Sequence, residues 1–359
     1  YDQALSWIDE AVRRLPQGAV GVAAEVMASK SVTLFRRGLY GDAIDWGKRA
    51  VALAGRSRDP RITAYAHNML ANSYVEQGAL KQAVRHLVPS TRLYGELHDL
   101  RGQSAAGNNL ASCYQLLGDM DRALYHYQEA LQADTRLGNV AHAAIIHNNI
   151  GEVLLTLGRV QQAREHLNEV LAAFETRPGL AALTGLALVN LSRCALIDGD
   201  AATAETHARR GIRLLQSVGA QGLLDEAELQ LVDVRIAQRK YGVALKRARA
   251  AIERARASGA RLLEARGLRL LGVALAAHGD DARAREALDE SLAIARAIDA
   301  GLEEGRALLD MARLARTSDG SREVDRALDR AQRILERSGA APELEEITRL
   351  RRETASPST

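Results

Sequence analysis

The stretch RGQSAAGNNLASCYQLLGDMDRALYHYQEALQADTRLG, residues 101–138, decides the fold of this chain. Apolar residues recur at i, i+3, i+4 and i+7 on both sides of Gly118, and this spacing predicts two amphipathic helices. Asp119 can cap the second helix, and Gly138 can end it. The stretch is therefore expected to form a helical hairpin.

The same pattern returns along the chain at a nearly fixed interval. Successive turn glycines lie 40 or 41 residues apart, except that the last step spans two repeats, and an alanine follows each glycine after five residues. A glycine turn followed by a small residue at a fixed period is typical of a stacked-repeat protein. The glycine and alanine pairs are Gly38 and Ala43, Gly78 and Ala83, Gly118 and Ala123, Gly158 and Ala163, Gly199 and Ala204, and Gly279 and Ala284.

The hairpin at 101–138 resembles the tetratricopeptide repeat. That repeat has about 34 residues, so each helix here is longer by under a turn. The longer form is similar to the sensor domains of maltose-activator-like bacterial regulators and of signal-transduction ATPase regulators, and to kinesin light chains. The resemblance rests on Leu110, Ala111, Tyr114, Gly118, Ala123, Tyr127, Ala130 and Leu131.

The resemblance implies an all-α fold, a right-handed α-solenoid superhelix of about nine antiparallel helix pairs. We expect the solenoid over residues 1–340 and a C-terminal capping helix with a frayed tail over 341–359. In the capping segment, acidic residues near Pro342 and arginines near Glu353 match the helix dipole. The expected repeats are 1–15 in part, 18–58, 61–98, 101–138, 140–178, 180–219, 221–259, 261–299 and 301–339.

The charge balance and the distribution of apolar residues argue against some classes of function. The chain has 359 residues, with 48 basic and 45 acidic side chains and a net charge of +3. This balance does not favour a nucleic-acid binder. We find no run of about 18 apolar residues and no secretory signal, which predicts no transmembrane helix and a cytoplasmic location. Because the chain starts in mid-repeat at Tyr1, without methionine, we expect it to be part of a longer polypeptide.

Two cysteines are too few for a disulfide framework. Cys113 and Cys194 each lie five residues before a turn glycine, so they occupy the same position two repeats apart. Stacked helices lie about 8–10 Å apart, and a disulfide needs Cα atoms within about 7 Å. We therefore predict two free, mostly buried thiols and a reducing compartment.

Four histidines form a ladder rather than a cluster. Zinc ligands must converge on one point, whereas side chains one repeat apart cannot, so packing is the expected role. Motifs for an activated serine, a zinc protease, a P-loop and a C-x-x-C pair are missing. The sequence thus predicts no enzyme, no metal and no cofactor. The ladder is His86, His126, His166 and His207.

Proline 89 falls inside an expected second helix, where it removes a backbone donor. Two interpretations stay open: a kink tolerated on the outer face, or a functional hinge.

Asparagines form the most unusual pattern. Asparagine is an indifferent helix former, yet Asn68, Asn108 and Asn148 recur every 40 residues. By the resemblance, this first ladder faces the concave groove, where amides can bond to the backbone of an extended peptide. A second ladder, one residue further on, contacts either the same ligand or the adjacent helices, tying repeats together. The second ladder is Asn109, Asn149 and Asn190.

The same alignment extends the candidate groove. A charged stretch further along, Arg266 and Arg269 with Glu226 and Asp233, is either a second contact region or a solvated face, and the solvated face is the favoured interpretation. Because the central repeats offer few basic residues, a carboxylate-clamp co-chaperone is not expected. The predicted peptide- or partner-binding residues are Asn68, Asn72, Asn108, Asn109, Ser112, Gln115, Asn148, Asn149, Glu152, Asn190 and Arg193.

These patterns predict a non-enzymatic module that binds a protein or peptide in its concave groove, or another domain of the same polypeptide. Its expected place is the sensor or regulatory region of a larger bacterial signal-transduction or transcription-regulatory protein. Two alternatives are an adaptor that links two proteins without switching, and an accessory that delivers peptides to a catalytic domain. Direct nucleic-acid and membrane binding are not expected, and self-association is left open.

Overall fold

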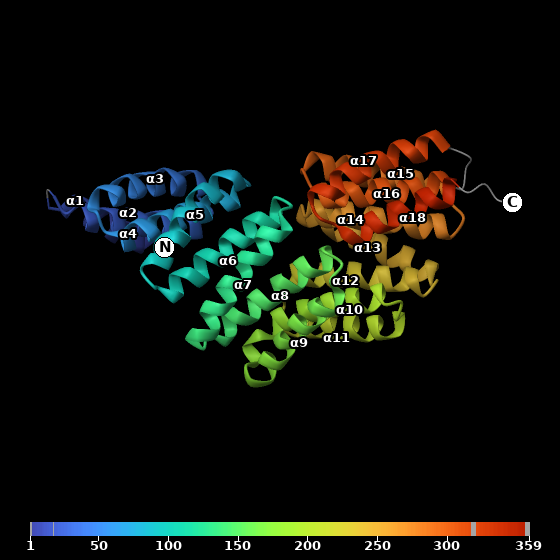
Figure 1. Cartoon of the computed structure of the whole chain (residues 1–359), viewed down its shortest axis with the longest axis horizontal. Coiled ribbons are helices and arrows are strands. Elements are labelled where there is room, and N and C mark those ends of the chain that lie inside the picture. Colours follow the sequence, from blue (N-terminus) through green and yellow to red (C-terminus); the bar gives the residue numbers. More distant parts are fainter. Residues whose placement is uncertain (1, 17, 317–320, 356–359) are drawn as a thin grey trace. The chain divides into compact units, whose positions relative to one another are not determined.

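The computed structural model describes residues 2–16, 18–316 and 321–355, and every regular element in them is helical (Figure 1). The predicted all-α helical repeat solenoid is therefore confirmed. The chain divides into two compact units, Tyr1–Ile146 and His147–Thr359, called unit 1 and unit 2 below. The division falls inside helix α8. The start at Tyr1 and the tail at 356–359 lie outside the described residues.

The helices from α2 to α17 follow one another along the chain, and α1 and α18 stand at the two ends. The helices up to the division are α1 (Asp2–Arg14), α2 (Val20–Arg36), α3 (Tyr40–Ser57), α4 (Pro60–Glu76), α5 (Leu80–Glu96), α6 (Leu100–Leu116), α7 (Met120–Leu137) and α8 (Val140–Thr156). The later ones are α9 (Val160–Thr176), the short 3-10 turn η1 (Pro178–Leu180), α10 (Ala181–Ile197), α11 (Ala201–Ser217), α12 (Gln221–Ala237), α13 (Tyr241–Ser258), α14 (Arg261–Ala277), α15 (Asp281–Ala297), α16 (Gly301–Arg316), α17 (Ser321–Arg337) and α18 (Ala341–Ala355).

The turn between α6 and α7 shows why the hairpin forms. Gly118 has a φ of +84°, a left-handed conformation that favours glycine. The backbone N–H of Asp119 then donates to the carbonyl of Tyr114 at 2.9 Å, which closes the end of α6. The Asp119 carboxylate accepts from the N–H of Arg122 at 3.1 Å, and Gly138 ends α7 at a φ of +64°. The predicted cap and the predicted helix end are both present.

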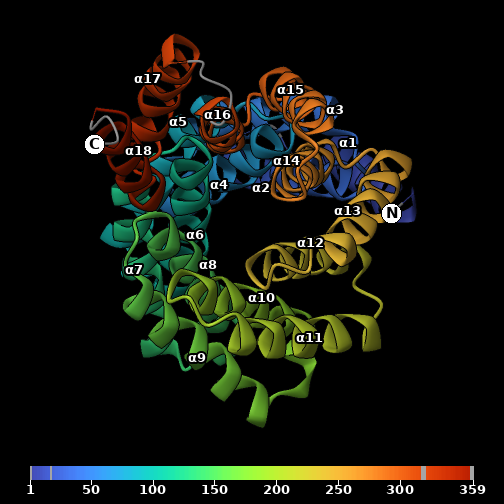
Figure 2. The ribbon, with the colours of Figure 1, turned by 90° about the vertical axis from the view of Figure 1, so that its right-hand side faces the viewer.

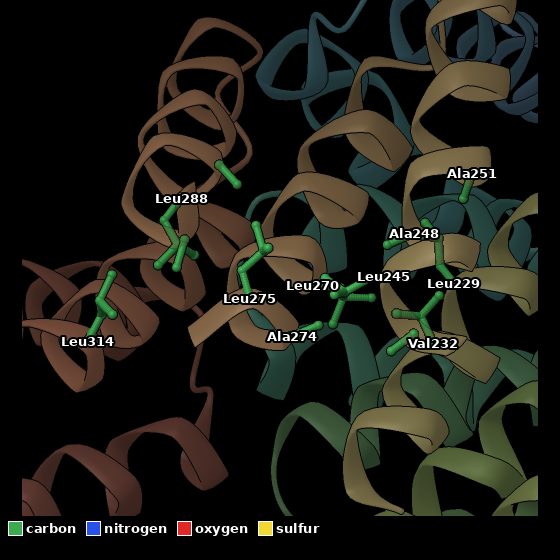
Figure 3. Close-up of a cluster of buried hydrophobic side chains, with 13 residues drawn as sticks. Leu229, Val232, Leu245, Ala248, Ala251, Leu270, Ala274, Leu275, Leu288 and Leu314 are labelled. Carbon is green, nitrogen blue, oxygen red and sulfur yellow. The ribbon is translucent and has the colours of Figure 1, made fainter. Parts of the chain in front are cut away.

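Packing within a hairpin joins a small residue of the first helix to a large one of the second. A Cβ added to Gly151 of α8 would lie 2.8 Å from Cδ2 of Leu167 in α9, so the leucine side chain would have to shift to admit a larger residue. In unit 2 the core continues through α12, α13, α14 and α15, where Leu229, Leu245 and Leu270 are buried together (Figure 3). Truncating such a leucine typically costs about 2–5 kcal/mol. The alternation of small and large apolar residues therefore holds the repeats together.

Unit 2 is built in two layers. First helices of neighbouring repeats contact one another, in the order α10, α12, α14, α16 and α18. The second helices α11, α13 and α15 lie on the other side of this row (Figure 2). Side chains on the open face of α10 to α18 therefore lie along one continuous inner surface, called the inner face of unit 2 below.

Both cysteines are free and fully buried, as predicted. Burial raises the pKa of each thiol, Cys113 and Cys194, to about 11. They lie in different units. Neither is a reactive thiolate at neutral pH.

Helix α10 belongs to a strongly apolar segment, although the sequence contains no uninterrupted run of about 18 apolar residues. Among the described residues, Pro178–Ile197 is the one segment long and apolar enough to cross a membrane by length and composition. In the fold, 61% of the most apolar 18-residue window of that segment is buried, because α10 packs against α9, α11 and α12. The apolar composition is thus explained by its place in the core.

Candidate functional site

In unit 1, three of the predicted amides come together. The Asn109 amide of α6 donates to the side-chain oxygen of Asn72 in α4 at 2.9 Å, and to that of Asn68 at 3.4 Å. Asn68 is only 5% exposed. These bonds cross from one repeat to the next. This geometry matches the second role considered above, in which amides tie repeats together.

Unit 2 contains an equivalent cluster with a charge in it. The Asn190 amide of α10 donates to Asn148 and to Glu152 of α8, at 3.2 Å each. Asn148 also donates to Glu152 at 3.2 Å, and Arg193 donates to the Asn190 oxygen at 3.3 Å. Burial, and then the nearby carboxylate of Glu226, raise the pKa of Glu152.

Exposure separates the predicted residues into two groups. Asn68, Asn148 and Asn190 are buried and lie within the packing between helices. The remaining candidates are half-buried, and Gln115 accepts a hydrogen bond from the Tyr127 hydroxyl at 2.9 Å. A binding role for the groove residues stays a prediction, and the half-buried group carries it. That group is Asn72, Asn108, Asn109, Ser112, Gln115, Asn149, Glu152 and Arg193.

The inner face of unit 2 holds a cavity of about 390 Å³, within the range of small-ligand sites. Its lining comes from α8, α10, α12, α14, α16 and α18, so one cavity spans several repeats. Arg193 is the only predicted binding residue in it. The full lining is Leu155, Arg193, Leu196, Ile197, Gln230, Asp233, Arg266, Arg269, Arg306, Leu309, Asp310, Arg313, Pro342 and Glu343.

One side of the cavity is a network of ion pairs between repeats. Arg269 of α14 contacts Glu303 at 2.5 Å and Asp310 at 2.8 Å, both in α16. Arg306 contacts Glu343 of α18 at 2.6 Å. Burial opposes the charge on Arg269, but the two carboxylates outweigh it and raise the pKa of Arg269. This network joins the last three first-layer helices.

Arg193 differs from the other arginines of the cavity. Its guanidinium forms no ion pair with any residue in the described ranges, and its hydrogen bond goes to a neutral amide. Burial, then the like charges of Arg306 and Arg266, lower the pKa of Arg193. Glu152 and Glu226 oppose this effect only in part. The cavity thus contains a cation whose charge is incompletely balanced.

The interpretation of the charged stretch as a solvated face was wrong. Arg266 and Arg269 have side chains only 15% and 12% exposed, because they turn toward the inner face and pair with acids of neighbouring helices. Sequence reasoning also missed Arg306. A signal was available, since Glu226, Arg266 and Arg306 recur at 40-residue steps.

The histidine ladder is part of the packing. His86 stacks on Tyr74 and lies against His67, with the two Nδ1 atoms 2.9 Å apart. His166 and His147 repeat this pair in unit 2, also at 2.9 Å. No group of three or more metal-ligating side chains is found in residues 2–16, 18–316 and 321–355.

The repeated hairpins and the layered arrangement define a helical-repeat solenoid. Residues 102–176 and 143–217 match one tetratricopeptide repeat family profile, and residues 229–301 match another. The matches together span more than half of the chain. The chain belongs to the tetratricopeptide repeat family. Comparison with curated proteins finds no match.

Solved structures share the fold at low sequence identity. The apo form of the quorum sensor NprR from B. thuringiensis is 12% identical, with 92% of each chain covered and a TM-score of 0.69. A Rap protein complexed with competence and sporulation factor is 14% identical, with 93% of this chain and 99% of that one covered and a TM-score of 0.58. The signal-transduction ATPase PH0952 from Pyrococcus horikoshii, which has a tetratricopeptide repeat sensor, is 17% identical over 75% of this chain and 41% of that one, with a TM-score of 0.58.

Proposed function

We propose that this chain binds a peptide or a partner segment on its inner face, and acts as the sensor region of a larger cytoplasmic signal-transduction or transcription-regulatory protein in bacteria. It acts by binding and not by catalysis. The observation that carries the proposal is the cavity of unit 2, to which several successive repeats contribute. Such a surface suits an extended ligand, which crosses one repeat after another.

The fold comparisons support this proposal. The names of two similar structures describe a quorum sensor and a tetratricopeptide repeat sensor of a signal-transduction ATPase. A third is a complex with a factor. Binding of a ligand across several repeats favours one curvature of the stack over others, and this population shift is how a sensor of this kind would signal.

Peptide selection tests the proposal. A random peptide library is selected on the purified chain, and the selected peptides are measured by isothermal titration calorimetry. Asp233→Trp, which places a bulky ring in the cavity, should weaken binding at least tenfold. Asp289→Trp, on the exposed side of α15, is the matched control and should leave affinity within about twofold. Failure to select any peptide, or equal binding by both variants, contradicts the proposal.

A further inference from the structure

The exposed side of the second helices in unit 2 changes the sign of its charge along the stack. In each of these helices, three exposed positions follow the buried alanine of the repeat, Ala204 in α11, after two, five and six residues. In α9 and α15 they hold five acidic residues and one asparagine, whereas in α11 and α13 they hold four basic residues and no acidic one. Because these positions lie outside the packing between helices, the stacking does not set the sign of their charge. The four basic residues are Arg209, Arg210, Lys246 and Arg249.

A groove of about 330 Å³ lies between the two basic helices. Residues of α11, α12 and α13 line it, and among them are three arginines and a single carboxylate, that of Glu228. Helix α12 contributes Glu228 and Leu231 to this groove, but Gln230 and Asp233 to the cavity of the inner face. The groove is therefore a separate surface, on the outer layer of the same repeats. Its arginines are Arg209, Arg213 and Arg247.

Carboxylates neutralise this surface only in part. Arg247 and Arg209 each contact a carboxylate, at 2.6 Å and 2.7 Å. Arg213 and Arg249 are both exposed, and neither forms an ion pair with a residue that the structure describes. Two cations of this face thus have no counter-ion in the described part of the chain, and their charge is available to a partner.

Acidic side chains on both flanks restrict what can dock on these helices. Helix α9 precedes the two basic helices in the stack, and α15 follows them. Stacked helices lie about 8–10 Å apart, so the basic strip is about 20 Å wide. A nucleic-acid duplex or a membrane surface reaches beyond such a strip and meets the acids, whereas a protein helix is about 10–12 Å across. The flanking acids are Glu165 and Glu169 in α9, and Glu286, Asp289 and Glu290 in α15.

The groove itself also favours a protein over a nucleic acid. Among the described residues, none that lines the groove is aromatic, so a nucleobase has no ring to stack on. Carboxylates of a protein segment, in contrast, can accept paired hydrogen bonds from exposed guanidinium groups.

We propose that the outer face of α11 and α13 docks a short acidic segment of a partner protein. Arg213 and Arg249 supply the main attraction, because neither is paired within the described chain, and the groove between the helices receives the segment. Complementary charge of this kind speeds association and helps to select the partner. This inference goes beyond the proposed function, since it assigns a second binding surface on the other layer of unit 2.

Peptide selection against a charge-reversal variant tests the chemistry. A library of random 16-residue peptides is selected on the native chain and depleted on the double variant Arg213→Glu with Arg249→Glu. We expect the remaining peptides to contain Asp and Glu at least twice as often as the starting library. A selection that yields no such enrichment overturns the inference.

Affinity measurements on the selected peptide test the residues. In fluorescence anisotropy the double variant should bind the peptide at least tenfold more weakly, and Arg213→Gln with Arg249→Gln should lose less. A peptide with Lys in place of its acids should bind the double variant better than the native chain. These two effects of opposite sign cannot come from partial unfolding, and their absence in a variant with a native circular dichroism spectrum overturns the inference.

A matched control removes the effect of net charge. Arg326→Glu with Arg333→Glu makes the same charge change on the exposed side of α17, which is also a second helix. This variant should bind the acidic peptide within about twofold of the native chain. An equal loss in both double variants would mean that the peptide responds to the charge of the whole chain, and the docking surface is then wrong.

Two further outcomes separate this surface from the cavity and from other partners. Asp233→Trp, which fills the cavity, should leave acidic-peptide binding unchanged. If it weakens that binding, the peptide lies in the cavity, so the proposed function stands and this inference is overturned. An oligothymidylate and phosphatidylserine vesicles serve as competitors. Should either bind the face of α11 and α13 while acidic peptides do not, the partner is not an acidic protein segment.

Discussion

One position in the first helix of the repeat carries different polar side chains in the two units. Asn68 in unit 1 and Arg269 in unit 2 each lie ten residues before their turn. The asparagine accepts from a neighbouring amide, whereas the arginine contacts two carboxylates of the next repeat. The solenoid needs small and large apolar residues between its helices, but it leaves this position free to vary. Chemistry at that position can therefore change while the fold stays the same.

The difference also has an energetic consequence. An amide pair is neutral, so losing one partner leaves an unsatisfied dipole, at about 1–3 kcal/mol. Losing one partner of a buried ion pair leaves an uncompensated charge, at about 3–5 kcal/mol. Unit 2 should therefore be more sensitive than unit 1 to substitution at this position.

The largest expected effect is at Arg269. Arg269→Met leaves Glu303, 6% exposed at its side chain, without its ion-pair partner, and leaves Asp310, 4% exposed, with Arg313 alone. We expect the free energy of unfolding of unit 2 to fall by about 3–5 kcal/mol. Hydrogen–deuterium exchange of α14 and α16 measures this change, and the helices of unit 1 serve as the internal reference.

A triple variant controls for the loss of the arginine side chain itself. Arg269→Met combined with Glu303→Gln and Asp310→Asn removes all three charges and should recover much of the lost stability. If it is no more stable than Arg269→Met alone, the uncompensated carboxylates are not the cause.

The amides should give a smaller effect. Asn109→Ala removes the bond to Asn72 at 2.9 Å and should destabilise unit 1 by about 1–2 kcal/mol in urea unfolding. Asn190→Ala in unit 2 also removes a donor to Glu152 and should cost more, about 2–3 kcal/mol. Equal losses at the two sites would mean that the charge of Glu152 plays no part.

The sequence predicted much of the fold and little of the cavity. Turns such as Gly118 have a local cause, a left-handed glycine followed by an aspartate cap, so their positions could be deduced within one repeat. Which asparagine bonds to which could not, because the Asn190 to Glu152 contact joins residues 38 apart in the chain. The burial of Arg266 depends on the stacking of α12, α14 and α16, and the periodicity alone does not contain that information.

Acid should weaken both units, since each contains a histidine pair. Burial, and then the partner ring, lower the pKa of His67 and of His147 from the model-peptide value of 6.5 to about 4. Between these values the unfolded chain binds more protons than the folded one, so stability falls as pH drops from 6.5 toward 4. Because solvent reaches the rings and screens part of the effect, we expect about 1–2 kcal/mol per pair.

A single substitution makes this test specific to one unit. His67→Phe removes the titrating ring from unit 1 and leaves the His147 pair of unit 2 as the control. Exchange rates measured at pH 7 and pH 5 should then differ less in α4 and α5, and as much as before in α8 and α9. An unchanged pH response in α4 and α5 would assign the acid sensitivity to other groups.

The smallest expected effect concerns the turn that departs from the repeat pattern. Arg239 has a φ of +59° where the corresponding hairpin turns at Gly118, Gly158, Gly199 and Gly279 have glycine. A left-handed non-glycine residue costs about 1–2 kcal/mol, and the extra freedom of glycine in the unfolded chain offsets about 0.5–1 kcal/mol of that. Arg239→Gly should therefore stabilise unit 2 by about 0.5–1 kcal/mol in thermal unfolding.

The reverse change in unit 1, Gly118→Arg, should destabilise unit 1 by a similar amount, because the backbone there has the same left-handed turn. A loss of stability in Arg239→Gly would mean that the arginine side chain contributes more than its strained backbone costs.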